Sequence, residues 1–416
     1  MIRSLAIGQI SLGTGQYRYP LWPPLTEGCP RSSTSEIAYP LTVDYDYSRV
    51  SAGLFDQPAL PGLDRWTPLL PPLDERLALG EGGTALIPLE GGAGGWDGRL
   101  YIKDESRNPT WSHKDRLNRC AVSAAALSGS AGVVVASSGN HAGSAAAYAA
   151  RAGLPCVALV SAGAPLEVQA WIRSYGAVVL QVEREARWSV MRQIVRQLGY
   201  HPVSNLTEGG HTGHPFGPEG YKSIAYELFL QLGRRPPAAV FVPTGYGELL
   251  FGVWKGFAEL QRLGLSPTVP RMFACEPAAR APLFQALAQG RPVAAVPARP
   301  TRAVSIATTV SGYRALLAVQ ESGGWAIRVT DADLVASREG LARAGIWAEL
   351  SAAAGLAGCR LALDQGERFD GPVVCISTAS GFKRWADGSG AKPAPQVSDD
   401  LFEINRVLRS HYGLDV

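Results

Sequence analysis

Short apolar segments alternate with amphipathic segments along most of the chain beyond residue 98. The apolar runs are rich in β-branched residues, as in VVVA (133–136) and CVALV (156–160). They are followed by stretches with apolar positions at helical spacing, as in HAGSAAAYAARAG (141–153). Buried strands between amphipathic helices are typical of parallel sheets covered by helices. The pattern therefore predicts an α/β protein with parallel-rich sheets flanked by helices.

The predicted elements cover most of this region. Strands are expected at residues 98–105, 131–139, 155–161, 177–182, 237–245, 270–277, 324–330 and 372–379. Helices are expected at residues 113–129, 141–153, 165–176, 184–199, 218–233, 248–264, 331–345 and 401–413. We expect the domains to be a small mobile α/β domain at 122–225 and a large one made of 76–121 plus 226–390. Residues 391–416 are predicted to be a linker and a last helix.

The first 75 residues differ from the rest. They contain many Pro, Gly, Ser and Tyr residues and lack sustained helical periodicity. We expect residues 1–75 to form an irregular N-terminal extension that packs on the main body, with Trp22, Leu54, Phe55 and Trp66 as apolar anchors. Disorder of this segment is the alternative.

Composition excludes several classes of function. Hydrophobic residues make up 46% of the chain and charged residues 18%, which is enough for sizeable cores. The net charge is +3 and the basic residues are scattered, so nothing favours nucleic acid or an anionic membrane surface as a partner. The apolar runs are shorter than the roughly 18 residues of a membrane span, and the N-terminus makes a poor signal peptide.

The cysteines and histidines do not have the spacing of metal ligands. The six cysteines lie far apart, several of them inside apolar runs, which favours buried, reduced thiols in a cytoplasmic protein over disulfides. His211 and His214 lie in a Gly-rich segment, where a loop role is favoured over a metal site. No metal is predicted.

Three junctions between predicted elements could bind a ligand, because open α/β sheets bind ligands beyond the carboxyl ends of their strands. In residues 133–144 a buried strand leads through SSGNH into a helix, whose free amides suit an anion or simply a helix cap. In residues 240–257 a strand ends in PTGYGE before a helix, where glycines allow backbone amides to face a phosphate. The turn matches neither nucleotide-binding fingerprint.

The third junction carries a lysine. In residues 108–119, Lys114 lies at the start of a helix beside His113 and Arg116. Nearby cations and a helix N-terminus disfavour the ammonium form, which helps a lysine to act as an amine nucleophile. A solvated helix end with ordinary salt bridges is the alternative.

Together these segments resemble those of the fold-type II pyridoxal 5′-phosphate (PLP) enzymes, and among them the threonine synthases most. The resemblance covers most of residues 65–385 in matching order and spacing. It rests on RWTPLLP (65–71), LGEGGTALIPL (79–89), IKDESRNPTWSHKDR (102–116), SSGNHAGSAAAYAARAGL (137–154), EGYKSIAYELFLQLG (219–233), VPTGYGELLFGVWKGF (242–257), IWAELSAAAGLAG (346–358) and VCISTASGFK (374–383). It implies a tryptophan synthase β-like fold with the cofactor between two domains.

The resemblance also implies roles for particular residues. Lys114 corresponds to the lysine that binds the cofactor as a Schiff base and later moves protons at the substrate carbons. Asn140 corresponds to the residue that contacts the cofactor's phenolic oxygen, and Thr378 to a hydroxyl at its pyridine nitrogen. The phosphate loop corresponds to Gly245, Tyr246, Gly247, Glu248 and Leu249. The substrate site is predicted to comprise Ser137, Ser138, Gly139, His141, Trp111, His113 and Arg116.

Several positions depart from the family pattern. Trp111, His113 and Leu117 replace Gly, Phe and Gly of the motif NPTGSFKDRG. Trp111 could narrow the substrate space or cap the cofactor edge, and His113 could be catalytic or face the surface. Glu248 in a phosphate loop is tolerable only if its side chain points away or meets a cation. ELSAA (349–353) stands where the family has EPASA.

The resulting hypothesis is a PLP-dependent carbon–oxygen lyase that converts O-phosphohomoserine and water to threonine and phosphate. For the leaving phosphate, Lys103, Arg107 and Arg116 are candidate cations. One alternative is β-replacement or β-elimination on O-phosphoserine, serine or threonine in a specialised pathway. Another is a non-catalytic paralogue that keeps the scaffold. We expect an amino-acid substrate, cytoplasmic location and a homodimer, with no nucleic-acid or membrane partner.

Overall fold

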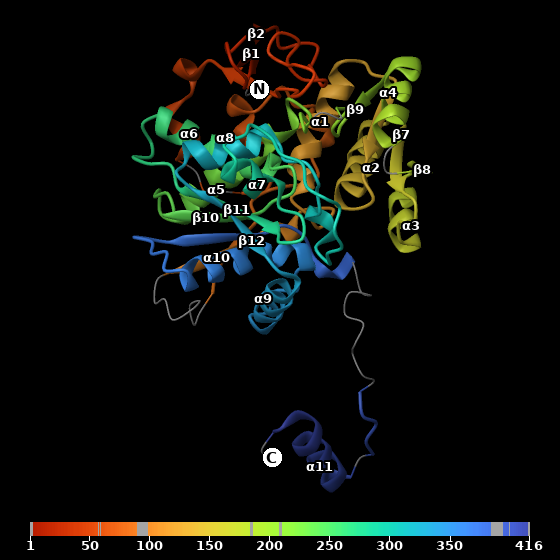
Figure 1. Ribbon diagram of the computed structural model, residues 1–416, viewed down its shortest axis with the longest axis vertical. Helices are drawn as coiled ribbons and strands as arrows, with labels where there is room; N and C mark the ends of the chain where they lie inside the picture. Colours follow the sequence, from red (N-terminus) through yellow and green to blue (C-terminus); the bar gives the residue numbers. More distant parts are fainter. Residues whose placement is uncertain are drawn as a thin grey trace. The chain divides into compact units, whose positions relative to one another are not determined.

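The computed structural model describes residues 3–56, 58, 60–89, 99–183, 186–207, 210–383, 394–398 and 400–414. The chain forms two compact units, Met1–Lys383 and Arg384–Val416 (Figure 1). Within the described ranges no helix is long and apolar enough to cross a membrane.

The larger sheet of the first unit has six strands in the order β12-β11-β10-β13-β5-β4. All neighbours are parallel except β4 and β5. The strands are β4 (Ala85–Pro88), β5 (Leu100–Asp104), β10 (Ala239–Pro243), β11 (Arg271–Pro277), β12 (Trp325–Val329) and β13 (Val373–Ser377).

Helices cover both faces of this sheet, because alternate side chains of a strand point to opposite faces. Val240 and Val242 of β10 pack in one core with α5 (Lys222–Gln231), α6 (Glu248–Arg262) and α8 (Tyr313–Glu321). Phe241 packs in a second core with α9 (Asp331–Arg343) and α10 (Ala354–Asp364), and its ring stacks on that of Phe273 at 4.5 Å. The short helix α7 (Pro282–Ala288) follows β11.

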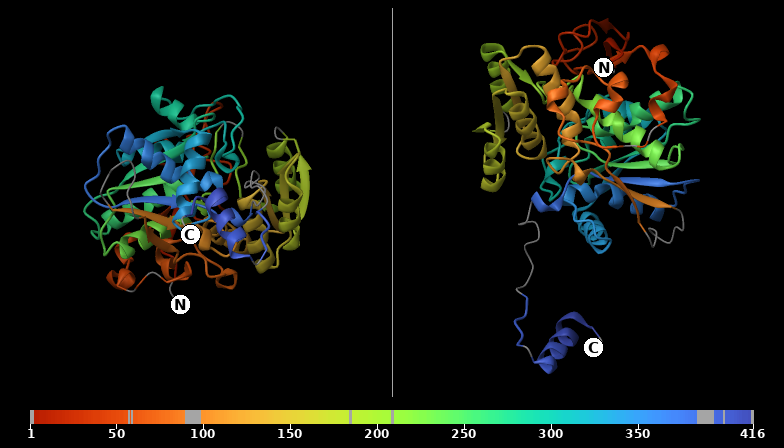
Figure 2. Two further views of the ribbon diagram at one scale, coloured as in Figure 1. Left: turned by 90° about the horizontal axis from the view of Figure 1, so that it is seen from below. Right: turned by 180° about the vertical axis from the view of Figure 1, so that it is seen from behind.

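The smaller sheet has four parallel strands in the order β8-β7-β6-β9. They are β6 (Gly132–Ala136), β7 (Cys156–Ser161), β8 (Val178–Val182) and β9 (Tyr200–Pro202). The helices beside it are α2 (Asn140–Ala152), α3 (Leu166–Ser174) and α4 (Arg187–Leu198). Both views in Figure 2 show this sheet and its helices set apart from the six-stranded sheet.

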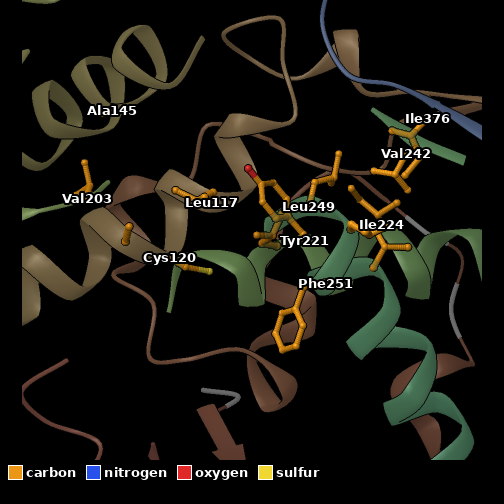
Figure 3. Packing of buried hydrophobic residues seen from close by; sticks show 14 of the residues in the cluster. Leu117, Cys120, Ala145, Val203, Tyr221, Ile224, Val242, Leu249, Phe251 and Ile376 are labelled. Carbon is orange, nitrogen blue, oxygen red and sulfur yellow. The ribbon is translucent and has the colours of Figure 1, made fainter. Parts of the chain in front are cut away.

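Helix α1 (Lys114–Leu127) links the two sheets through a shared core. Leu117 and Cys120 of α1 are fully buried, as is Tyr221 of the adjacent 3-10 helix. Figure 3 shows these side chains near Leu249 of α6, with Ala145 of α2 on their other side. Lys114, at the N-terminal end of α1, is therefore fixed by packing from both sheets.

The N-terminal segment is more regular than expected. It contains a three-stranded antiparallel sheet of β1 (Ala6–Ser11), β2 (Arg18–Tyr19) and β3 (Leu41–Tyr45). Trp66 and Phe55 are buried as predicted, with 1% of each exposed. The short strands escaped prediction because they carry mixed polar residues and make their pairs across distant turns.

Other expectations can be compared directly. Each strand and helix predicted beyond residue 98 is present within a few residues of its expected bounds. The helices α7, α8 and α10 and the strands β4 and β9 were missed. All six cysteines are buried and none forms a disulfide. The division into two domains within residues 76–390 stays a prediction, because residues 76–383 belong to one compact unit.

The second unit contains the predicted last helix, α11 (Leu401–Tyr412). The side chain of Asp400 caps this helix by accepting a hydrogen bond from the backbone N of Phe402 at 2.9 Å. Of the predicted linker 391–400, only residues 394–398 and 400 lie among the described residues.

Candidate active site

Lys114 is the first residue of α1 and its side chain is half-buried. Its Nζ lies 5.8 Å from the centre of the Tyr221 ring and makes no hydrogen bond or ion pair with a described residue. Burial lowers the pKa of Lys114, and the negative charge of Glu248 opposes that shift. An unpaired amine with a lowered pKa is suited to nucleophilic attack on an aldehyde.

The end of strand β13 is joined to the segment before Lys114. The carbonyl oxygen of Thr378 accepts a hydrogen bond from the backbone N of His113 at 3.0 Å and lies 3.1 Å from its ring Nδ1. Ser112 pairs with Ala379 in an isolated bridge. His113 thus does not face the surface: its ring is half-buried and lies against Tyr221, with 5.4 Å between the ring centres.

Asn140 begins helix α2, where the chain leaves β6. Its Oδ1 accepts a hydrogen bond from Lys383, and its Nδ2 donates one to Glu349 at 2.9 Å. These partners fix which side of the amide carries the nitrogen. One Nδ2 hydrogen is left without an acceptor in the described chain, and it is available to a ligand oxygen.

The predicted carboxylate site is the N-terminus of α2. Gly139 is the residue before the helix, so the first amides of α2 lack intrahelical partners. The Oγ of Ser138 accepts a hydrogen bond from the backbone N of Ser161 at 2.8 Å, which leaves its hydroxyl hydrogen to donate. The Nε2 of His141 is buried and has no hydrogen-bond partner among the described residues. Burial lowers the pKa of His141 to about 3, so this imidazole is neutral near pH 7.

The glycine loop between β10 and α6 forms a cradle of backbone amides. Gly247 has φ +86°, and a Cβ there would overlap Ala315 of α8. A Cβ at Gly245 would lie 3.2 Å from the Cγ2 of Thr308. The amides of Gly245, Gly247, Glu248 and Leu249 donate to no acceptor in the part of the chain that the structure describes. This arrangement at the start of a 15-residue helix is suited to a phosphate.

The side chains of Tyr246, Glu248 and Leu249 in this loop each have different surroundings. Leu249 is 5% exposed and packs in the core, so only its backbone can serve a ligand. The ring of Tyr246 stacks on His211, with 4.0 Å between the ring centres. Glu248 is buried, and its Oε1 lies so close to Gly213 that a side chain there would overlap it. This carboxylate forms no ion pair with a described cation, so the second arrangement that the sequence left open, contact with a cation, is not found among the described residues.

The predicted cations lie elsewhere. Arg116 is fully buried and bound by the carboxylates of Glu105 and Glu227, at 2.7 and 2.5 Å. Lys103 is bound to Glu227 at 2.7 Å, and the largely exposed Arg107 pairs with Asp104. We therefore remove all three from the proposed substrate site. Glu227, which binds both Lys103 and Arg116, lies more than 110 positions from each of them, so their spacing to Lys114 was misleading.

Trp111 and Lys383 lie in surroundings that the sequence did not indicate. Trp111 is 52% exposed and has φ +61°, a left-handed conformation where the motif resembled has glycine. Its position at the surface argues against a role in narrowing a buried substrate space. Lys383 was not predicted as a site residue, although it closes the last motif of the resemblance. Its Nζ bonds both Asn140 and, at 3.1 Å, the carbonyl of Thr110.

The residues fit PLP. Lys114, whose pKa is lowered by burial, begins α1; a glycine loop with free backbone amides joins β10 to α6; and Asn140, with a spare N–H, begins α2 after β6. Thr378 follows β13 and is held next to His113, one residue from the amine. Each of these groups matches one functional group of the cofactor: the aldehyde, phosphate, phenolic oxygen and pyridine nitrogen.

Comparison with known proteins gives the same answer. The family described as pyridoxal-phosphate dependent enzyme matches residues 77–379. The threonine synthase of Methanosarcina acetivorans is 32% identical over 348 residues, covering 81% of this chain and 84% of that protein. The threonine synthase of Methanocaldococcus jannaschii is 32% identical over 393 residues, covering 90% and 95%. Maize serine racemase has a similar fold, with a TM-score of 0.62 and 20% identity over 79% of this chain and 92% of that chain. This chain therefore belongs to the fold-type II pyridoxal-phosphate dependent enzymes, and its cofactor is PLP.

Proposed function

We propose that this enzyme is a carbon–oxygen lyase that releases phosphate from O-phosphohomoserine and adds water to give threonine. The observation that carries the proposal is the similarity to threonine synthases along nearly the whole chain, 90% of it in one case. The residues predicted to bind the cofactor stand at the starts of α1, α2 and α6 and directly after β13, which supports the same reaction class.

The bound cofactor supplies an electron sink for the negative charge left when a proton is removed from the substrate's Cα. Lys114 is the residue that we assign to moving protons at Cα and Cβ, because its amine is unpaired and its pKa is lowered by burial. Thr378 offers a neutral hydroxyl at the pyridine nitrogen, which leaves that nitrogen mostly unprotonated. A moderate electron sink of this kind suits elimination and replacement at the side chain.

The substrate's carboxylate is assigned to the start of α2. Ser137, Ser138 and Gly139 lead into this helix, whose first backbone amides are available to an anion. For the substrate's phosphate we assign Lys383, whose ammonium bonds oxygens of Thr110 and Asn140 and faces the ring of Trp171 at 5.3 Å. Its charge contributes to lowering the pKa of His113, after burial and Lys114, so it lies near the reactive segment.

Substrate assays test this proposal. Phosphate release should be fastest with O-phosphohomoserine, and O-phosphoserine, serine and threonine should give little phosphate or 2-oxo acid. A protein that prefers O-phosphoserine, or that makes 2-oxo acid from serine or threonine, would establish the alternative β-elimination or β-replacement instead. The Lys114→Ala variant is the negative control for every substrate.

A chemical test locates the cofactor. Borohydride treatment of the holoenzyme should attach the cofactor irreversibly to the peptide that contains Lys114. Lys383→Ala is the matched control, since it removes a different amine from the same site and should leave that label in place. Label on any other lysine would contradict the assignment.

Cytoplasmic location and a homodimer remain predictions. Sedimentation analysis of the holoenzyme would establish the number of subunits, and fractionation of cells would establish the compartment.

A further inference from the structure

A buried carboxylate lies at the cradle that we assign to the cofactor's phosphate. Glu248 is the first residue of α6, so its own backbone amide belongs to that cradle. The residue is 8% exposed, and its carboxylate accepts no hydrogen bond from a described residue. A carboxylate without donors is unusual in a buried site, because burial of an uncompensated charge is costly.

Groups from five elements influence this carboxylate electrostatically. They are His211 of the loop after β9, Lys114 of α1, Arg314 of α8, His141 of α2 and Tyr221 of the 3-10 helix. Burial by itself would raise the pKa of Glu248, but the basic groups of this set outweigh burial and lower it. Without cofactor, Glu248 is therefore ionised.

Two of those groups are neutral near pH 7. Burial lowers the pKa of His211 to about 4 and that of His141 to about 3, so both rings are uncharged there. Lys114 and Arg314 are the other basic groups. Arg314 is 1% exposed, its Nη atoms bind backbone carbonyls that include Thr212, and its Nε has no partner within the described ranges. Neither Lys114 nor Arg314 forms an ion pair with Glu248 in the described structure.

A phosphate that enters this cradle brings up to two more negative charges next to Glu248. Like charges in a buried site raise each other's pKa, so one of them tends to take up a proton. A protonated carboxyl can donate a hydrogen bond to a phosphate oxygen, whereas an ionised one can only repel it.

We propose that Glu248 takes up one proton from solvent when the cofactor's phosphate enters the cradle, and that the protonated carboxyl then donates a hydrogen bond to the phosphate. No bond between heavy atoms changes in this step, and the proton is released again when the phosphate leaves. The inference rests on the proposed cofactor site. It makes Glu248 a positioning residue whose charge opposes the cofactor at high pH.

Calorimetry measures this coupling directly. PLP is titrated into apoenzyme at pH 8 in two buffers of different ionisation enthalpy, and the difference gives the protons taken up. Wild-type protein should take up about one proton more than Glu248→Gln. The variant should bind PLP at least about tenfold more tightly at pH 8, since one pKa unit corresponds to a tenfold change in affinity. That advantage should shrink as the pH falls.

Pyridoxal, which lacks the phosphate, separates two explanations. Glu248 also acts on the pKa of Lys114, and an effect through that amine would change the affinities for PLP and pyridoxal equally. The proposal requires that only PLP gains. Glu367→Gln, which removes a half-exposed carboxylate that pairs with Arg271, is the matched control and should change neither affinity.

Equal proton uptake by wild type and Glu248→Gln, or an equal gain for pyridoxal, would overturn the inference. Should the variant fail to fold, wild-type protein alone suffices. The protein must then take up more protons with PLP than with pyridoxal. This difference must be larger than the change in protonation of the cofactor's own phosphate. Failure of PLP to attach to Lys114 at all would instead contradict the proposed function.

Discussion

The carbonyl oxygen of Thr378 accepts both the backbone N–H and the ring Nδ1–H of His113, at 3.0 and 3.1 Å. A carbonyl cannot donate, so the ring proton of His113 resides on Nδ1 and its Nε2 is an acceptor. Burial and the charge of Lys114 lower the pKa of His113 well below its usual value. This pair fixes the distance between the end of β13 and the start of α1, and so brings Thr378 and Lys114 to one site.

Replacement of His113 by phenylalanine, the residue of the motif resembled, should keep the backbone hydrogen bond and the contact with Tyr221. Only the ring hydrogen bond is lost, which should lower the free energy of unfolding by about 1 kcal/mol in denaturant titration. Because His113 stays neutral at working pH, the shape of the pH profile of kcat/KM should not change. Loss of an ionisation between pH 6 and 8 in the variant would instead assign His113 to acid–base catalysis.

Lys383→Met tests how Asn140 is oriented. Methionine is an unbranched apolar side chain one atom shorter than lysine and cannot donate to the Oδ1 of Asn140, so the amide loses one of its two anchors. We expect PLP affinity to fall by about three- to tenfold, the usual value of one hydrogen bond, when measured by absorbance titration. The KM for a phosphorylated substrate should rise as well, because the same ammonium is assigned to its phosphate.

Glu349→Gln is the companion variant, since it weakens the other anchor of Asn140. It should reduce PLP affinity. Any rise in the KM for the phosphorylated substrate should be no larger than the weaker binding of PLP accounts for. If Lys383→Met and Glu349→Gln both bind PLP with the affinity of the wild-type protein, then Asn140 does not need these anchors to bind the cofactor.

The fold and the junctions that carry the candidate site residues were predictable because their signals are local. Lys114, Asn140 and the loop from Gly245 each stand where a predicted strand or loop enters a predicted helix. In a parallel sheet such junctions gather at one edge, so residues far apart in sequence meet there. The apolar runs of β6 and β10 mark buried strands by composition alone.

Contacts between distant side chains were not predictable. Arg116 is two residues from Lys114, but its partner Glu227 lies 111 positions away and draws the guanidinium out of the site. Lys383 and Asn140 are separated by 243 positions. Helix spacing gives the direction of a side chain only relative to its own helix, and the neighbouring elements decide what it meets.

A buried histidine pair should make the protein sensitive to acid. The Nδ1 of His214 accepts the backbone N–H groups of Phe216 and Gly217, so its Nε2–H must donate to the Nε2 of His201 at 2.7 Å. Burial lowers the pKa of His201 to about 4. A lowered pKa means that the unfolded chain binds the proton more tightly, so stability is present above about pH 6.5 and is lost as the pH falls towards 4.

The loss from His201 amounts to ~3 kcal/mol when fully developed, from a shift of about 2.5 units. His201→Gln keeps an acceptor for His214 but does not titrate. Its stability should therefore decline less than that of wild type in urea titrations at pH 7, 6 and 5. His411→Gln, which changes an exposed histidine of α11, should follow the wild-type curve. Parallel curves for His201→Gln and wild type would show that this pair does not govern acid sensitivity.

The buried ion network beneath the site should be more important for stability than any exposed pair. Glu227 binds Arg116 at 2.5 Å and Lys103 at 2.7 Å, and all three side chains are at most 1% exposed. Glu227→Gln leaves two buried cations with a single carboxylate, Glu105. Breaking a buried pair in this way typically costs about 3–5 kcal/mol, whereas Glu367→Gln at a half-exposed pair should cost less than about 1 kcal/mol. Both are measured by denaturant unfolding of the holoenzyme.

Since Arg116 follows Lys114 on α1 by only two residues, the Glu227 variant should also lose cofactor affinity. A stable variant with normal affinity would contradict this structural role.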